Sequence, residues 1–268
     1  MGSLSFMCLK LAFAATAVMT LAVAAPALAW GPKPSPAPAP AASNGQPAKA
    51  GAEDRAAAER MDPLGRAAFW SSQFAIDPKD IEAGLRLSAA LRAIGRSEEA
   101  GNTVQQLLVI YPNNVEVLLE SARVAVQSGQ GFFAVAPAQK AAALAPKDWR
   151  APSLMAVGLA QIGRTAEALQ QHQKALALAP DNPNALSNAA MFYAAQGDKA
   201  QAETLLRKAV KSPDASVKVR QNLAMILGLQ GKFDEAELLQ RQDVPPQMAE
   251  ANMAYLKAAA GDQPVAGK

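Results

Sequence analysis

The chain has 268 residues, of which 50% are hydrophobic and only 5% aromatic, a mix that favours alanine-packed helices over sandwiches or barrels. Its formal net charge of +3 is spread without a basic run, which argues against nucleic-acid binding. The single cysteine, Cys8, excludes a disulfide scaffold, so stability must come from a packed helical core.

Residues 1–29 are predicted to form a secretory signal peptide. Lys10 supplies the positive charge, residues 11–23 are apolar, and the segment ends in a small-x-small pattern cleaved after Ala29. An uncleaved membrane anchor is the alternative, because residues 11–29 come close to a spanning length. We expect export to the periplasm.

Residues 30–62 are predicted to form a linker rich in proline and alanine. Prolines alternate with other residues from Pro32 to Pro40, which removes backbone donors and favours an extended polyproline II spacer. A ligand for a proline-recognition domain is the alternative interpretation of this segment.

A repeat of 34 residues then dominates the sequence. Four columns keep this period: glycines, two sets of small residues, and prolines. They are Gly95, Gly129, Gly163, Gly197 and Gly231; Ser88, Ala122, Ala156, Ala190 and Ala224; Ala100, Ala134, Ala168, Ala202 and Ala236; and Pro78, Pro112, Pro146 and Pro180.

Each unit is predicted to be a hairpin of two helices. A first helix such as 154–162 runs into Gly163, which can take the left-handed backbone geometry that ends a helix. A second helix, 165–179, ends at Pro180, and Ala156 and Ala168 let the two backbones approach closely. Because one hairpin cannot bury its apolar face alone, the units must stack.

This spacing and residue order resemble the tetratricopeptide repeat, with a half-unit, about five full units and a terminal capping helix within residues 63–260. The units start near Ile81, Val115, Trp149, Pro183 and Val217. The resemblance implies an all-α, right-handed superhelical solenoid of helical hairpins. The capping helix is predicted over residues 247–260, and residues 261–268 are predicted to be a flexible tail.

The sequence departs from the repeat pattern at three positions. Leu107 and Asp243 replace the small residue expected late in the second helix. Pro137 falls inside a second helix and is expected to kink or delay it.

In the family that the chain resembles, the first helices line a groove that binds peptides. The matching positions combine apolar side chains with arginines and amides, which fits an extended or helical segment carrying apolar and some acidic side chains. They include Leu119, Arg123, Val126, Arg150, Val157, Gln161, Asn184, Met191, Gln221 and Met225. For Met191 and Met225, packing between repeats is an equal alternative.

No constellation for catalysis stands out. His172 is the only histidine, and the predicted mature chain has no cysteine, so the usual ligands for a metal and the usual nucleophile–base pairs are missing. We interpret His172 as a packing or surface residue. We therefore expect no enzyme activity, no cofactor and no small-molecule substrate.

Several stretches resemble the tight-adherence (Flp) pilus assembly proteins of the TadD-like group. They are residues 148–151, 219–224, 229–233 and 243–256. The resemblance implies a scaffold for pilus assembly or secretion, with pilus or secretin components as partners and association with the outer membrane. No apolar segment of lipobox type precedes Cys8, which argues against a lipid anchor. A general periplasmic adaptor in envelope assembly is the alternative.

Overall fold

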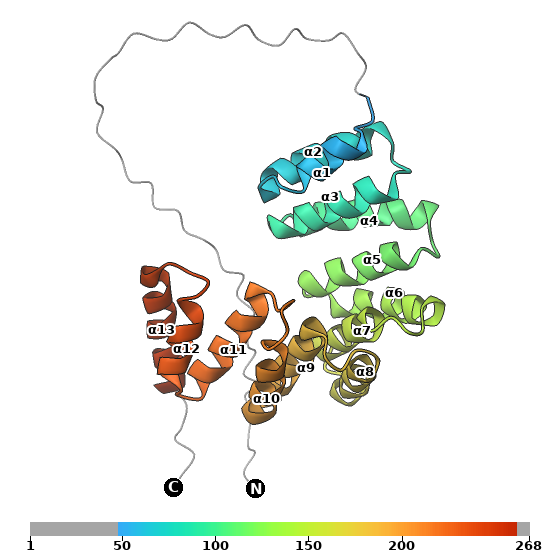
Figure 1. Cartoon of the computed structure of the whole chain (residues 1–268). Coiled ribbons are helices and arrows are strands. Elements are labelled where there is room, and N and C mark those ends of the chain that lie inside the picture. The colour runs from blue at the N-terminus through green and yellow to red at the C-terminus, as the bar shows by residue number, and fades with distance from the viewer. Residues whose placement is uncertain (1–47, 262–268) are drawn as a thin grey trace, which may run out of the picture. The chain divides into compact units, whose positions relative to one another are not determined.

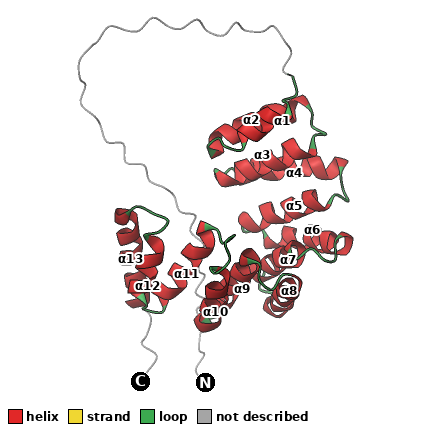
Figure 2. Ribbon diagram, in the orientation of Figure 1, coloured by secondary structure: helices red, strands yellow, loops and turns green. Residues whose placement is uncertain are grey.

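The computed structural model describes residues 48–261, which form thirteen helices and no strand (Figure 2). The predicted signal peptide 1–29, the first part of the predicted linker (30–47) and the tail from 262 lie outside the described residues. No helix between residues 48 and 261 is both long and apolar enough to cross a membrane. The prediction of an all-α solenoid of helical hairpins is confirmed.

Five helical hairpins follow one another along the chain (Figure 1). Their first helices are α3 (Ile81–Ala93), α5 (Val115–Gln127), α7 (Arg150–Gln161), α9 (Pro183–Ala195) and α11 (Val217–Leu229). Their second helices are α4 (Ser97–Ile110), α6 (Gly131–Leu144), α8 (Thr165–Leu178), α10 (Lys199–Ala209) and α12 (Phe233–Gln240). The helices α1 (Ala52–Ala58) and α2 (Pro63–Ile76) precede them, and α13 (Pro246–Gly261) follows.

The turn inside each hairpin is built on a glycine, as predicted. The five repeat glycines all have positive φ, between 70° and 89°, a conformation that residues with a side chain rarely adopt. At Gly163 the backbone N–H of Arg164 donates to the carbonyl of Leu159 at 2.9 Å, which satisfies a carbonyl left free at the helix end. The glycine therefore both stops the first helix and reverses the chain.

The small residues of both columns lie where the two helices of a hairpin cross. All ten members, from Ser88 to Ala236, have no exposed surface at all. A larger side chain at any of them would have to displace a neighbouring backbone.

Two departures from the repeat pattern are compensated by a first-helix residue. Leu107 is fully buried beside Gly84, where a Cβ atom would lie 2.7 Å from the Leu107 Cδ1 atom. Asp243 lies beyond the end of α12 and accepts a hydrogen bond from the Arg220 Nε atom at 2.9 Å. In both units the larger residue on the second helix side faces a first-helix residue 23 positions earlier that also differs from its equivalents in the other repeats. Gly84 makes room for Leu107, and Arg220 pairs with Asp243.

Pro137 was predicted to kink or delay its helix, and the predicted delay is wrong. The helix α6 begins two residues after Gly129, at the same place as every other second helix, and continues through Pro137. The proline removes one helical hydrogen bond, but Ala134, Ala138 and Ala141 remain fully buried against neighbouring helices. Tertiary packing outweighs the lost bond.

The predicted linker 30–62 is also too long, because residues 52–58 form the helix α1. This segment is rich in alanine, a strong helix former, and carries Glu53 and Asp54 at its positive end. Its last residue, Ala58, is fully buried, so α1 belongs to the folded unit.

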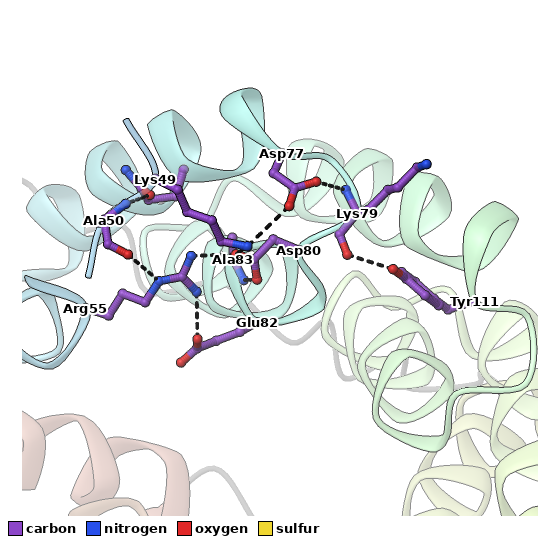
Figure 3. A network of polar contacts seen from close by, with 10 residues as sticks. Lys49, Ala50, Arg55, Asp77, Lys79, Asp80, Glu82, Ala83 and Tyr111 are labelled. Atoms are coloured by element: carbon purple, nitrogen blue, oxygen red, sulfur yellow. Dashed lines mark hydrogen bonds and ion pairs between the residues drawn. The ribbon is translucent and has the colours of Figure 1, made fainter. Parts of the chain in front are cut away.

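An ionic network fixes α1 and the residues before it to the start of α3 (Figure 3). Arg55 pairs with Asp80 and, at 2.7 Å, with Glu82. Lys49 lies 3.0 Å from Asp80 and 3.2 Å from Asp77. The hydrogen bond from Arg55 is the main reason why the pKa of Asp80 lies well below its ordinary value.

At the other end, α13 packs against α11 and α12. Ala249, Met253 and Leu256 are buried, and a Cβ atom on Gly228 would lie 2.6 Å from the Leu256 Cδ1 atom. The glycine thus makes room for the leucine, and α13 covers apolar surface that α11 would otherwise expose.

Candidate peptide-binding surface

The first helices form one continuous row. Each of α3, α5, α7 and α9 contacts the next first helix, whereas the second helices within residues 48–261 contact only first helices or α13. Among the described residues, only first helices contact helices of their own kind in the next repeat, and they form a surface that runs from α3 to α11. We call this surface the first-helix row.

Nine of the ten predicted groove residues keep some access to solvent. Six side chains are half-buried and three are exposed. Arg123, Val126, Arg150, Val157, Met191 and Met225 are half-buried, and Gln161, Asn184 and Gln221 are exposed. All nine lie on α5, α7, α9 and α11, which contact one another in sequence.

The prediction that Leu119 lines the surface is wrong. Its side chain has no exposed area and belongs to a buried cluster with Leu118, Ala141 and Ala151. The same repeat position holds Ser153 and Ser187, which are also buried. This position faces the neighbouring first helix, and only at the last repeat, at Gln221, is it exposed.

Between α3 and α5 the row is held by a buried carboxylate. Glu120 is 3% exposed and accepts hydrogen bonds from the Ser88 hydroxyl at 2.7 Å and from the Arg92 Nε atom at 2.8 Å. The Arg123 Nη1 atom donates to it as well, at 2.6 Å. A buried charge with this many partners ties the helices together.

Between α5 and α7 the tie is Arg150. Its Nη2 atom lies 2.6 Å from both Glu116 and Asp148, so a guanidinium predicted to meet a partner already has two carboxylates. Burial alone would raise the pKa of Asp148, but the hydrogen bonds from Arg150 outweigh it and the pKa is lowered. The charge of Arg150 is compensated within the chain.

Glutamines add a second kind of tie in this half of the row. The side-chain amide of Gln127 donates to the carbonyl of Arg92 at 3.1 Å, and that of Gln161 donates to the carbonyl of Val126 at 2.8 Å. Each satisfies a carbonyl near the end of the preceding first helix.

Beyond α7 the ties become neutral. The side-chain amide of Asn188 donates to the hydroxyl of Ser153 at 2.9 Å, and Asn222 does the same to Ser187 at 2.9 Å. These two bonds were not predicted, although the sequence does show a serine followed 35 residues later by an asparagine in both cases. These bonds use no charge, and Val157, Met191 and Met225 on the same three helices stay partly accessible to solvent.

His172, the one histidine, packs in the interior. It is 2% exposed, its ring lies 5.0 Å from the ring of Phe192, and neither ring nitrogen has a hydrogen-bond partner. Burial lowers its pKa to about 4, so the ring is neutral at pH 7. His172 is a packing residue.

Residues 48–261 hold no group of three or more His, Cys, Asp or Glu side chains placed to bind a metal ion. Two cavities, of about 250 and 190 Å³, lie beside α6 and α8, and none of the predicted groove residues lines them.

Comparison with known proteins gives a consistent assignment. Models of the tetratricopeptide repeat match residues 159–214 and 218–244. No curated protein sequence matches the chain.

Many solved structures match the chain, and three of them are compared with it here. They are a thermophilic tetratricopeptide protein of Thermus thermophilus (21% identity, 65% of this chain and 97% of that chain, TM-score 0.59), a tetratricopeptide repeat protein from Parabacteroides merdae (17%, 78% of both chains, 0.60) and the Cut9–Hcn1 hetero-tetramer of the APC/C (15%, 77% and 40%, 0.60). At these identities the likeness is one of fold. The repeat models identify tetratricopeptide repeats within residues 159–244, and the solved structures show that the described helices share the fold of such repeats.

Proposed function

We propose that this chain is a scaffold that binds a segment of another protein along α7, α9 and α11, during assembly of a tight-adherence (Flp) pilus or secretion apparatus. The repeat fold supports the general part of this proposal, because tetratricopeptide domains mediate contacts between proteins. The pilus role rests on the sequence resemblance alone.

The observation that carries the binding proposal is the contrast in the first-helix row. Val157, Met191 and Met225 are half-buried on three first helices that contact in turn. Methionine adapts its shape to a partner, and spaced apolar side chains on a helical surface anchor an extended or helical segment. The ties beside them are uncharged.

Lys218 places a positive charge at one end of the surface formed by α7, α9 and α11. It lies at the exposed start of α11 and makes no ion pair with any residue between 48 and 261. An acidic side chain of the partner can therefore pair with it at little desolvation cost. We infer a partner segment with apolar anchors and at least one carboxylate.

The proposed location is the periplasm. Its support is the predicted signal peptide, which lies outside the described residues. N-terminal sequencing of the purified native protein should find Trp30 as the first residue. A chain that keeps residues before Trp30 and is found in membranes would instead favour an anchor.

The function is tested by deleting the gene and restoring it in variant form. The unaltered chain should restore surface pili, whereas Met191→Asp/Met225→Asp should not, although its helical content is unchanged. Val109→Asp is the control, because Val109 is 83% exposed on α4. Normal pili in the deletion strain would reject the pilus role, and full rescue by the methionine variant would reject the surface.

A further inference from the structure

The second helix α6 differs from its equivalents at its start. Two phenylalanines, Phe132 and Phe133, follow its first residue and are 71% and 65% exposed. The equivalent pairs in the other four repeats contain no aromatic residue and are mostly acidic or polar. They are Glu98-Glu99, Ala166-Glu167, Ala200-Gln201 and Asp234-Glu235.

This exchange carries a cost within the monomer. Carboxylates at the start of a helix are stabilised by its positive end, and α6 has none in its first turn. The phenylalanine rings contact each other edge to face, with centroids 5.5 Å apart, yet both stay mostly in water. The folded chain alone gives no reason for two large apolar side chains here.

The backbone beneath these rings is fixed unusually tightly. Gly131 and Gly158 meet where α6 crosses α7, and a Cβ atom on Gly158 would lie 2.9 Å from the carbonyl oxygen of Gly131. Since neither glycine tolerates a side chain, the start of α6 is pressed against α7. The next two side chains are held outward on a rigid support.

A cavity of about 250 Å³ lies in the same patch. It is lined by both phenylalanines with Val135, Ala136 and Ile162, and by the longer side chains of Gln139 and Arg164. It is smaller than typical small-molecule sites, which begin at about 300 Å³. It is larger than the cavity of about 150 Å³ that holds a benzene ring. One aromatic side chain fits it.

One ion pair lies beside the cavity, through Arg164 in its lining. Arg164 and Glu167 are each 50% exposed and pair at 2.6 Å. Between Glu120 and Asp148 the sequence has no acidic residue, and on α6 itself Lys140 is the one charge. Lys140 can cover apolar surface with its aliphatic stem while its ammonium group stays in water.

We propose that a second copy of this chain covers this α6 patch, which we define as Phe132, Phe133, Ala136 and Ile162. A two-fold contact requires one surface to be complementary to itself. The patch offers both a protruding ring and a cavity that accepts one. Beside them lies the ion pair of Arg164, which lines the cavity, with Glu167, which does not. In a two-fold pair, each copy's phenylalanine enters the other's cavity. The Arg164–Glu167 pair of each chain then lies beside that of the other copy, where the two pairs can exchange partners without leaving a charge unpaired.

The strength of this dimer follows from its size. Two phenylalanines with their small neighbours bury less than the roughly 1,000 Å² expected of a stable interface. We therefore expect a weak dimer that dissociates on dilution. This inference is independent of the partner proposed for the first-helix row.

Sedimentation equilibrium of the full chain tests it. The average mass should rise with concentration from that of a monomer towards twice that value. Phe132→Ser/Phe133→Ser should stay monomeric, and Val109→Ser/Leu238→Ser, which removes two equally exposed apolar side chains elsewhere, should dimerise like the unaltered chain. Circular dichroism confirms that all three chains are folded.

Charge reversal tests the two-fold geometry. Arg164→Glu gives a patch with two carboxylates and Glu167→Arg gives one with two arginines, so each alone should self-associate more weakly, whereas their mixture should form heterodimers. A chain that is monomeric at every concentration overturns the proposal. So does a dimer that survives the phenylalanine change, or a monomer that binds lipid vesicles only when Phe132 and Phe133 are present.

Discussion

The two halves of the first-helix row are held together differently. From α3 to α7 the contacts include ion pairs around Glu120 and Arg150. From α7 to α11 the polar ties are the two Asn–Ser hydrogen bonds, with apolar side chains beside them. In the first half the charged side chains are already satisfied, whereas in the second half apolar surface stays accessible.

An arginine at a groove position therefore need not contribute to the binding of a partner. Arg123 and Arg150 lie at groove positions, but both donate to carboxylates of the same chain. A partner would have to compete with those carboxylates, so its gain from either arginine is small. Binding energy is expected where apolar side chains are accessible and polar groups are already paired, around Met191 and Met225.

Changes at buried titratable groups should alter the stability of the fold, and the largest change is expected from the protonation of His172. The unfolded chain binds a proton at this ring near pH 6.5, whereas the folded chain does so only near its lowered pKa of about 4. Stability therefore falls as pH drops from 6.5 to 4, by about 3 kcal/mol for a difference of this size.

Urea unfolding at pH 7, 5.5 and 4 measures this loss. His172→Leu should remove it, because the same repeat position carries Val104 and Leu206, both buried. Equal acid sensitivity in the variant and the unaltered chain would show that another group is responsible.

In the first half, Glu120→Ala should destabilise the fold by about 2–3 kcal/mol. The change leaves Arg92 and Arg123 facing each other without the carboxylate that both now bond. Thermal unfolding measures the effect. The matched control is Glu98→Ala, an exposed glutamate on α4, which should change stability by less than about 0.5 kcal/mol. Similar losses from both variants would contradict the role of the buried network.

Much of the fold could be predicted from the sequence because its signals are local. Gly163 ends a helix through its own backbone, and Ala156 and Ala168 set a crossing through their own size. These effects recur every 34 residues, so one unit explains the others. The helix α1 was missed because its alanines resemble the linker, and what fixes it in place, Arg55 with Asp80, joins residues 25 apart.

The site could be predicted only in part, for the opposite reason. Whether a groove position is exposed depends on the residue facing it from the next repeat. Leu119 is covered in the cluster that includes Ala151, and Arg150 meets Glu116, 34 residues earlier. The position of a residue within the repeat predicts on which helix it lies, but not which side chain of the neighbouring repeat covers it.

A smaller loss of stability is expected when a small buried residue of the hairpin α9–α10 is enlarged. Ala202→Leu should destabilise by about 1–3 kcal/mol, because Ala202 has no exposed surface where α10 crosses α9. Ala200→Leu, two residues earlier on the same helix and exposed, should be nearly neutral. Thermal unfolding of the pair measures the difference, and equal effects would mean that the register of this repeat is wrong.

The central claim is that a partner contacts the second half of the row. It is tested most directly by placing a photoreactive amino acid at exposed first-helix positions in the native host: Asn184 and Gln221 in the second half, and Glu116 and Gln127 in the first. Light should produce one and the same crosslinked partner from Asn184 and Gln221, and none from Glu116 and Gln127. A partner crosslinked from Glu116 or Gln127, with none from Asn184 and Gln221, would contradict the account.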